Sequence, residues 1–254
     1  MGNTKIIAAM LFGVIGYWIM TLAAQQDGRH ILISDTAAYQ MPNGLVAAVF
    51  SIENTGQPDR IIRATLDRKA ATINAPRGTA SIIIPAGKSH LSLEAAHLLL
   101  TDAEISYDIG TLLPVELAFE KAGTVRARIK VADPSSAPIL HGSQTHGAAA
   151  LDLGQNFDLK LKIRAEKDGW RVEVDASNFQ FSRNKVDGPH IPGVGHGHLY
   201  VSGTKIGRLY TPTAYIGQLP RGTHTVRVTL NTNNHMAYMS NGQIVEAKAV
   251  FTVD

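Results

Sequence analysis

Apolar and polar residues alternate one by one along several short stretches of this chain. In VRARIKV, residues 125–131, every second residue is apolar and the residues between are Arg or Lys. FDLKLKI, residues 157–163, and WRVEV, residues 170–174, show the same alternation, with acidic or basic residues between the apolar ones. Successive side chains of a β-strand point to opposite faces, so this period predicts strands with one buried and one solvated face. No helical period is sustained after residue 24, and we expect an all-β fold.

A stretch without any period divides the strand-rich sequence in two. Residues 132–150, ADPSSAPILHGSQTHGAAA, are rich in Pro, Ser, Gly and Ala and are predicted to be an interdomain linker. We therefore expect two antiparallel β-sandwich domains, cupredoxin-like or Ig-like, at residues 31–131 and 151–254. The linker histidines, His141 and His146, are interpreted as incidental loop residues.

The N-terminus predicts export. Lys5 is followed by an uncharged apolar run over residues 6–24, with small residues Ala23 and Ala24 at its end. Residues 1–26 therefore form either a cleaved signal peptide or a retained membrane anchor, in both cases as an apolar leader helix. The rest of the chain is expected in the periplasm or another extracytoplasmic space, secreted or anchored to the inner membrane by residues 6–24.

Composition excludes several classes of function. The 24 Lys and Arg residues nearly balance the 21 Asp and Glu residues and form no basic run, so no nucleic-acid partner is expected. The chain has no cysteine, which leaves His, Met, Asp and Glu as metal ligands. No nucleophile–base pair, phosphate-binding loop or carboxylate pair accompanies the histidines, and we expect a protein that is not an enzyme.

The segment GHGH, residues 195–198, carries the strongest chemical signal. Residues two apart on a strand point to the same side, so His196 and His198 can converge on one metal ion. Gly197 between them adds no side chain to the opposite face and permits close packing there.

The segment LNTNNHMAYMSNG, residues 230–242, supplies the remaining ligand candidates: His235, Met236 and Met239. We expect His196, His198 and His235 to form a three-nitrogen site, with His190, on a flexible loop, or a Met as a fourth ligand. Copper suits imidazole plus thioether, and the nearest acid in sequence is Asp187, so copper is favoured over zinc. Such a site needs neutral imidazoles and is expected to lose affinity below about pH 6. The alternative is that these histidines are solvated at strand ends, and His224 is expected to pack in the core rather than to bind metal.

The first strand-rich segment resembles the PCuAC-type periplasmic copper chaperones. The pieces ENTG, DR, IPAG, the His of AAHLLL and FEKAG occur in the order and spacing of that family, over residues 31–131. The resemblance implies a cupredoxin-like barrel with a Cu(I) site of His and Met side chains. Here only His97 remains of the motif, because Leu99 stands where the family has Met and the upstream His is absent near Ile73. The domain is therefore interpreted as a degenerate relative that serves as scaffold or docking surface, with His97 as a weaker ligand candidate.

The second segment resembles an uncharacterised exported β domain with the running pattern GHxHLYVxGxKIxRLY followed by LPxGxHxVxVxLNxNxH, over residues 177–253. Together these features predict an exported copper-binding protein that buffers copper or delivers it to a periplasmic or membrane cuproenzyme. The alternative is a membrane-anchored accessory subunit or interaction module without a metal role.

Overall fold

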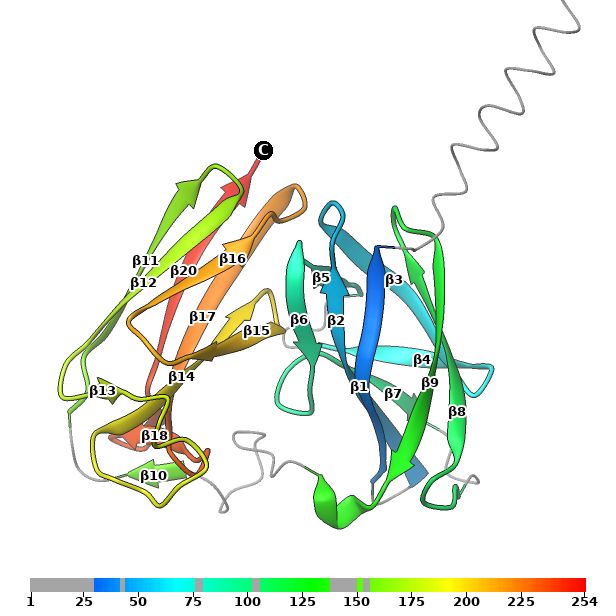
Figure 1. Cartoon of the computed structure of the whole chain (residues 1–254), viewed down its shortest axis with the longest axis horizontal. Helices are drawn as coiled ribbons and strands as arrows, with labels where there is room; N and C mark the ends of the chain where they lie inside the picture. Colours follow the sequence, from blue (N-terminus) through cyan, green and yellow to red (C-terminus); the bar gives the residue numbers. More distant parts are fainter. Residues whose placement is uncertain (1–29, 42–43, 76–79, 102–105, 138–149, 153–155) are drawn as a thin grey trace, which may run out of the picture.

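The computed structural model describes residues 30–41, 44–75, 80–101, 106–137, 150–152 and 156–254. These residues form an all-β, mostly antiparallel fold, as predicted, with one 3-10 turn at Pro134–Ser136. The ribbon separates into two lobes (Figure 1), and their strands are as follows. The N-terminal lobe holds β1 (Ile31–Gln40), β2 (Leu45–Asn54), β3 (Asp59–Leu66), β4 (Lys69–Asn74), β5 (Ile82–Ile84), β6 (Gly87–Leu91), β7 (His97–Thr101), β8 (Leu112–Phe119) and β9 (Thr124–Ala132). The C-terminal lobe holds β10 (Ala150–Asp152), β11 (Leu159–Glu166), β12 (Gly169–Ala176), β13 (Gln180–Phe181), β14 (Val194–Val201), β15 (Thr204–Leu209), β16 (Thr213–Gly217), β17 (Gly222–Thr232), β18 (Ala237–Ser240), β19 (Gln243–Ile244) and β20 (Glu246–Val253).

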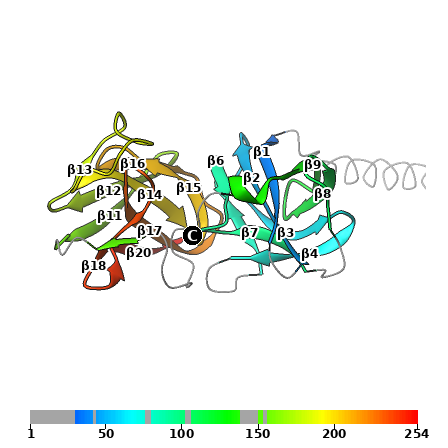
Figure 2. The ribbon, with the colours of Figure 1, turned by 90° about the horizontal axis from the view of Figure 1, so that it is seen from below.

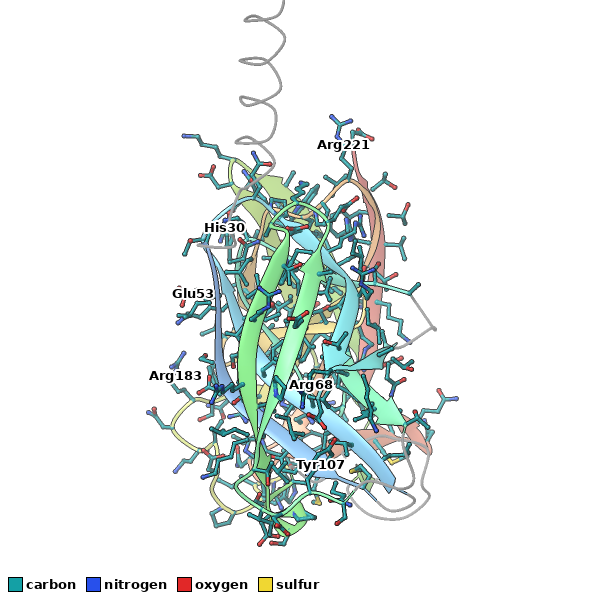
Figure 3. All side chains as sticks on the ribbon, turned by 90° about the vertical axis from the view of Figure 1, so that its right-hand side faces the viewer. His30, Glu53, Arg68, Tyr107, Arg183 and Arg221 are labelled. Atoms are coloured by element: carbon teal, nitrogen blue, oxygen red, sulfur yellow. The ribbon has the colours of Figure 1, made fainter. Side chains whose placement is uncertain are left out.

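The N-terminal lobe packs two groups of strands around one apolar core. Strand β2 pairs with β1, β6 and β7, and β3 pairs with β4, β5 and β8. Figure 3 views the lobe from the side of β8 and β9, which face the reader. The predicted alternation of β9 is confirmed, because its Arg and Lys side chains are exposed while Ile129 and Val131 are buried. The core between the strands includes Phe50, Ile61 and Leu98.

The C-terminal lobe packs a three-stranded sheet against a second, larger set of strands. Strands β11, β12 and β16 form the smaller sheet, and β14 lies between β15 and β17 in the other. Alternation in β11 is also confirmed over Leu159–Ile163, where the lysines are exposed and the leucines and Ile163 are half-buried. Leu199, Val201, Val226 and Val228 build the core between the two sheets.

The two lobes are joined along β6 and β15, which lie side by side in Figures 1 and 2. Lys205 of β15 pairs with His90 of β6 in antiparallel register. Further hydrogen bonds cross this boundary, among them Ala96 N to Gly203 O at 2.9 Å, Ala86 N to Gln218 O at 3.0 Å, and Thr204 Oγ1 to Ile83 O at 3.0 Å. Ile83 of the N-terminal lobe also packs in the core of the C-terminal lobe. The lobes therefore share both backbone hydrogen bonds and apolar contact.

The predicted leader, residues 1–26, and residues 138–149 of the predicted linker lie outside the described residues. Within the part of the chain that the structure describes, no helix is both long and apolar enough to span a bilayer.

Candidate metal centre

Strand β14 is buried on both faces, and its two faces carry different chemistry. Leu199 and Val201 face the apolar core. His196, His198 and Tyr200 alternate with them and are almost completely buried. A strand that buries imidazoles along one face has to provide polar partners for them, because unpaired polar groups in the interior are costly.

The two glycines of GHGH allow β14 to pack closely against its neighbours. A Cβ at Gly195 would lie 1.9 Å from the Asn231 backbone oxygen on β17. A Cβ at Gly197 would lie 3.2 Å from the Leu209 Cβ on β15. The expectation that Gly197 permits close packing is therefore confirmed, and Gly195 is the more tightly constrained of the two.

The third histidine comes from the turn that follows β17. His196 pairs in register with Asn231 of β17, so the chain leaves β17 beside His196. Thr232 holds the turn closed: its backbone N–H donates to Met236 O at 2.8 Å, and its Oγ1 accepts from Met236 N at 2.9 Å. His235 has a backbone φ of 68°, in the left-handed region that residues other than Gly adopt rarely. This turn directs the His235 ring toward the two histidines of β14.

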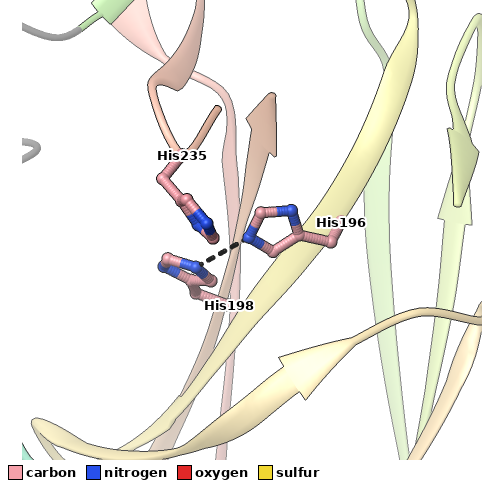
Figure 4. A group of neighbouring side chains, drawn as sticks. All are labelled: His196, His198 and His235. Carbon is pink, nitrogen blue, oxygen red and sulfur yellow. Dashed lines mark hydrogen bonds between the residues drawn. The ribbon is translucent and has the colours of Figure 1, made fainter. Parts of the chain in front are cut away.

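The three predicted histidines meet in space (Figure 4). The Nε2 atoms of His196 and His198 are 3.1 Å apart, and the ring centroids of His196 and His235 are 4.9 Å apart. One ligand nitrogen from each ring lies within 4.8 Å of the other two. Rings from β14 and from the β17–β18 turn thus converge, although His235 lies 37 positions after His198 in the sequence.

These separations fit a metal ion. Imidazole nitrogens bind zinc at about 2.0–2.1 Å, so nitrogens on one ion lie roughly 3 to 4 Å apart. The 3.1 Å between His196 and His198 is already inside that range. The wider separation, at most 4.8 Å, needs an inward shift of less than about 1 Å.

His198 is surrounded by polar groups from both lobes. Its Nδ1 lies 3.5 Å from Oε2 of Glu94, a residue of the β6–β7 connection in the N-terminal lobe. The Tyr200 hydroxyl and the Lys205 ammonium lie 3.3 and 3.4 Å from the same nitrogen. Lys205 also forms an ion pair with Glu94.

His235 forms the outer edge of the cluster. Its Nε2 lies 2.5 Å from Oδ1 of Asp187, whose side chain is 76% exposed. His235 itself is half-buried, whereas His196 and His198 are buried. The cluster therefore opens toward solvent beside His235 and Asp187.

Burial keeps the two β14 histidines neutral. Burial, together with the neighbouring His198 and His235, lowers the pKa of His196 to about 2. Burial also lowers the pKa of His198 to about 4, although hydrogen bonding to Glu94 opposes this shift. Burial would raise the pKa of Glu94, but the contacts with His198 and Lys205 outweigh it and hold that pKa well below its usual range. Histidine binds metals as the neutral imidazole, and a neighbouring carboxylate commonly orients the ring.

The remaining predicted ligands are His190, Met236 and Met239. His190 packs near Tyr238, with ring centroids 5.9 Å apart, and is not in the three-histidine group. Both of its ring nitrogens are buried, and neither has a hydrogen-bond partner among the described residues. Met236, next to His235 in the chain, and Met239 in β18 are both half-buried.

The other two buried histidines have their own partners. His97 lies in the N-terminal lobe, where its Nε2 is 2.9 Å from Asn74 Nδ2 and its Nδ1 is 3.0 Å from Ala95 O. Both nitrogens are thus engaged without a metal. His224 is fully buried, and its Nε2 donates to Pro220 O at 2.6 Å, as expected of a packed histidine.

Sequence reasoning missed Glu94, Lys205 and Tyr200. Tyr200 shares parity with the two β14 histidines, so the period-two rule could have placed it on their face. Glu94 gave no such signal, because it is 104 positions from His198 and belongs to the other lobe.

Comparison with known proteins gives similarities of fold. No family model and no curated protein matches the chain. Among solved structures, the chain is similar to the copper-bound PCuAC domain from PmoF2, with 22% identity over 43% of this chain and 94% of that one, at a TM-score of 0.37. The apo PCuAC domain from PmoF1 gives 22% identity over 43% of this chain and 95% of that one, also at 0.37. The Pseudomonas aeruginosa CupB2 chaperone is 11% identical over 88% of this chain and 100% of its own, at 0.26.

Proposed function

We propose that this protein binds copper extracytoplasmically through His196, His198 and His235, and that it buffers the metal or delivers it to a periplasmic or membrane cuproenzyme. The observation that carries the proposal is the convergence of three imidazoles, two of them buried, with one nitrogen each within 4.8 Å. A core without a ligand would not be expected to gather three such rings, because each is a polar group removed from water.

The donor set favours copper. Imidazole nitrogens bind copper and zinc, and zinc sites often add a carboxylate or water. Here the nearest carboxylate, Asp187, contacts His235 rather than joining the nitrogen cluster. Met236 and Met239 come from the same hairpin as His235, and a thioether is a ligand that selects copper over zinc. His190 is a further candidate, and its unpartnered nitrogens would gain a partner if its loop moved toward the cluster.

The placement of the cluster supports transfer rather than permanent storage. Three protein nitrogens leave a coordination position on a copper ion for a ligand from outside. The edge formed by His235 and Asp187 reaches solvent, so an acceptor protein can approach there. The apolar leader predicted over residues 1–26 supports an extracytoplasmic location.

Titration with Cu(I), Cu(II) and Zn(II) in competition with chelators tests the proposal. The wild type is expected to bind one copper ion per chain, and the His196→Ala/His198→Ala variant to lose that site. His97→Gln is the matched control. Because His97 lies outside the cluster, this substitution should leave copper binding unchanged. Equal copper stoichiometry and affinity in the wild type and the double variant would contradict the proposal, and a preference for zinc would contradict the choice of metal.

A further inference from the structure

The carboxylate nearest the buried end of the histidine cluster comes from the other lobe. Glu94 lies between β6 and β7, and only 16% of its side chain is exposed. Although Glu94 belongs to the N-terminal lobe, its side chain contacts His198, Lys205 and Tyr200 of the C-terminal lobe. Burying this carboxylate at a lobe boundary is unfavourable unless a positive charge or hydrogen-bond donors compensate its charge there.

We infer that Glu94 is a positioning residue for the metal site: it holds the proton of His198 on Nδ1, so that the Nε2 lone pair faces His196 and His235. This inference rests on the proposed function. It assigns to the N-terminal lobe a direct part in the site of the C-terminal lobe.

The geometry around His198 supports this assignment. A neutral imidazole carries one proton, on either Nδ1 or Nε2, and its partners decide which. Nδ1 faces Glu94 Oε2 at 3.5 Å and the Tyr200 hydroxyl at 3.3 Å, and Nε2 faces His196 Nε2 at 3.1 Å. A carboxylate accepts hydrogen bonds and cannot donate them, so Glu94 favours the tautomer with the proton on Nδ1. Hydrogen bonding of this kind commonly fixes the orientation of metal-binding histidines.

Lys205 makes the effect of Glu94 stronger. Its ammonium group is 3.4 Å from His198 Nδ1 and can only donate. If it donated to Nδ1, the proton of His198 would move to Nε2 and block the metal ligand. The ion pair with Glu94 engages Lys205 and leaves Nδ1–H free to face the carboxylate. Loss of Glu94 would therefore both remove the acceptor and release a competing donor.

The state of His196 is consistent with this arrangement. If His198 Nε2 accepts a hydrogen bond, the donor is His196 Nε2–H, and His196 Nδ1 then has no proton to donate. His196 Nδ1 is buried and has no partner among the residues that the structure describes. For both Nε2 atoms to bind one metal ion, the His196 proton would move from Nε2 to the unpartnered Nδ1, and His196 would remain a neutral imidazole.

The experiment compares Glu94→Gln with Thr204→Val in the full-length protein. Thr204→Val removes a hydrogen bond across the lobe boundary, to Ile83 O, without touching His198. Glu94→Gln is expected to weaken copper affinity about 10- to 100-fold, the usual effect of losing a residue that orients a ligand. Thr204→Val is expected to bind copper as the wild type does. Glu94→Gln leaves Lys205 without its counterion. The double variant Glu94→Leu/Lys205→Met is therefore made as well, because replacing both members of a buried ion pair usually preserves folding.

A second measurement does not depend on copper. Nitrogen–proton correlation NMR of the histidine rings in the metal-free protein reports which nitrogen of His198 carries the proton. The wild type and Thr204→Val are expected to show Nδ1–H, and Glu94→Gln a shift of the proton toward Nε2. An unchanged His198 tautomer in Glu94→Gln, or unchanged copper affinity, overturns the inference. Absence of copper binding by the wild type contradicts the proposed function instead, and the ring spectrum then still decides whether Glu94 positions His198.

Discussion

A Cβ atom on Gly217 would lie 2.1 Å from the backbone oxygen of Ala86, so the two lobes touch at a point where no side chain fits. Gly217 ends β16 in the C-terminal lobe, and Ala86 lies between β5 and β6 in the N-terminal lobe. The next residue, Gln218, accepts a hydrogen bond from Ala86 N at 3.0 Å. The close approach of backbone to backbone therefore depends on glycine at position 217.

Gly217→Ala is expected to separate the lobes and to destabilise the protein by about 1–3 kcal/mol, the usual cost of forcing a group into a filled space. It should also weaken copper binding, because Glu94 would move away from His198. Denaturant unfolding and copper competition measure the two effects. Gly207→Ala is the control, since a Cβ there meets no atom within 4 Å. A Gly217→Ala protein with wild-type stability would show that this contact does not hold the lobes together.

The strand pattern could be predicted from the sequence because it depends on local chemistry. Alternation in β9 and β11 follows from one buried and one solvated face, and the His-x-His spacing follows from the same period. From the sequence, His235 could be placed only in a segment that follows the strand of residues 226–230, without the direction of its ring. Its φ of 68° and the hydrogen bonds of Thr232 decide where the ring points, and these appear only in the folded chain.

The contribution of Glu94 could not be predicted, because it depends on how two lobes are placed. That placement follows from the β6–β15 pairing and from the Gly217 contact, neither of which has a sequence period. The loop of His190 illustrates the same limit, since the sequence allowed it to fold toward the cluster and the structure packs it near Tyr238 instead.

Gly195→Ala is expected to disturb the metal site through the backbone. The added Cβ would lie 1.9 Å from Asn231 O, so β14 would have to move away from β17 beside His196. We expect a loss of about 1–3 kcal/mol in the free energy of unfolding, together with weaker copper binding. Gly207→Ala serves again as the control in the same measurements. Wild-type stability and affinity in Gly195→Ala would mean that the β14–β17 contact is looser than the structure has it.

His235→Asn should separate folding from metal binding. Asn tolerates the left-handed conformation at this position better than most residues and removes the imidazole. The free energy of unfolding of the metal-free protein is therefore expected to change by less than about 1 kcal/mol, while copper affinity falls by at least tenfold. Thermal unfolding and chelator competition check both. His235→Val, a β-branched residue at the same φ, should by contrast lose stability as well as copper. If His235→Asn bound copper as tightly as the wild type, His235 would not be a ligand.

The stability of the metal-free protein should fall as the pH drops below about 6.5. Burial lowers the pKa of His196 to about 2 and that of His198 to about 4 in the folded chain, whereas unfolded histidines titrate near 6.5. The unfolded state therefore binds more protons between these values, and stability is lost as the pH decreases from the unfolded pKa toward the folded ones. At pH 5.5 the two residues together should cost about 3 kcal/mol relative to pH 8.

Urea unfolding in the presence of a chelator, from pH 8 to pH 5, measures this slope, and His196→Gln/His198→Gln supplies the comparison. The variant has no imidazole at either position, so its stability should depend less on pH even if it is lower at pH 8. Buried His224, whose pKa burial also lowers, remains in both proteins and contributes the same residual slope to each. Parallel pH profiles for the wild type and the variant would show that the two β14 histidines are not held neutral by the fold, and they would remove the electrostatic argument for a site prepared to receive a metal ion.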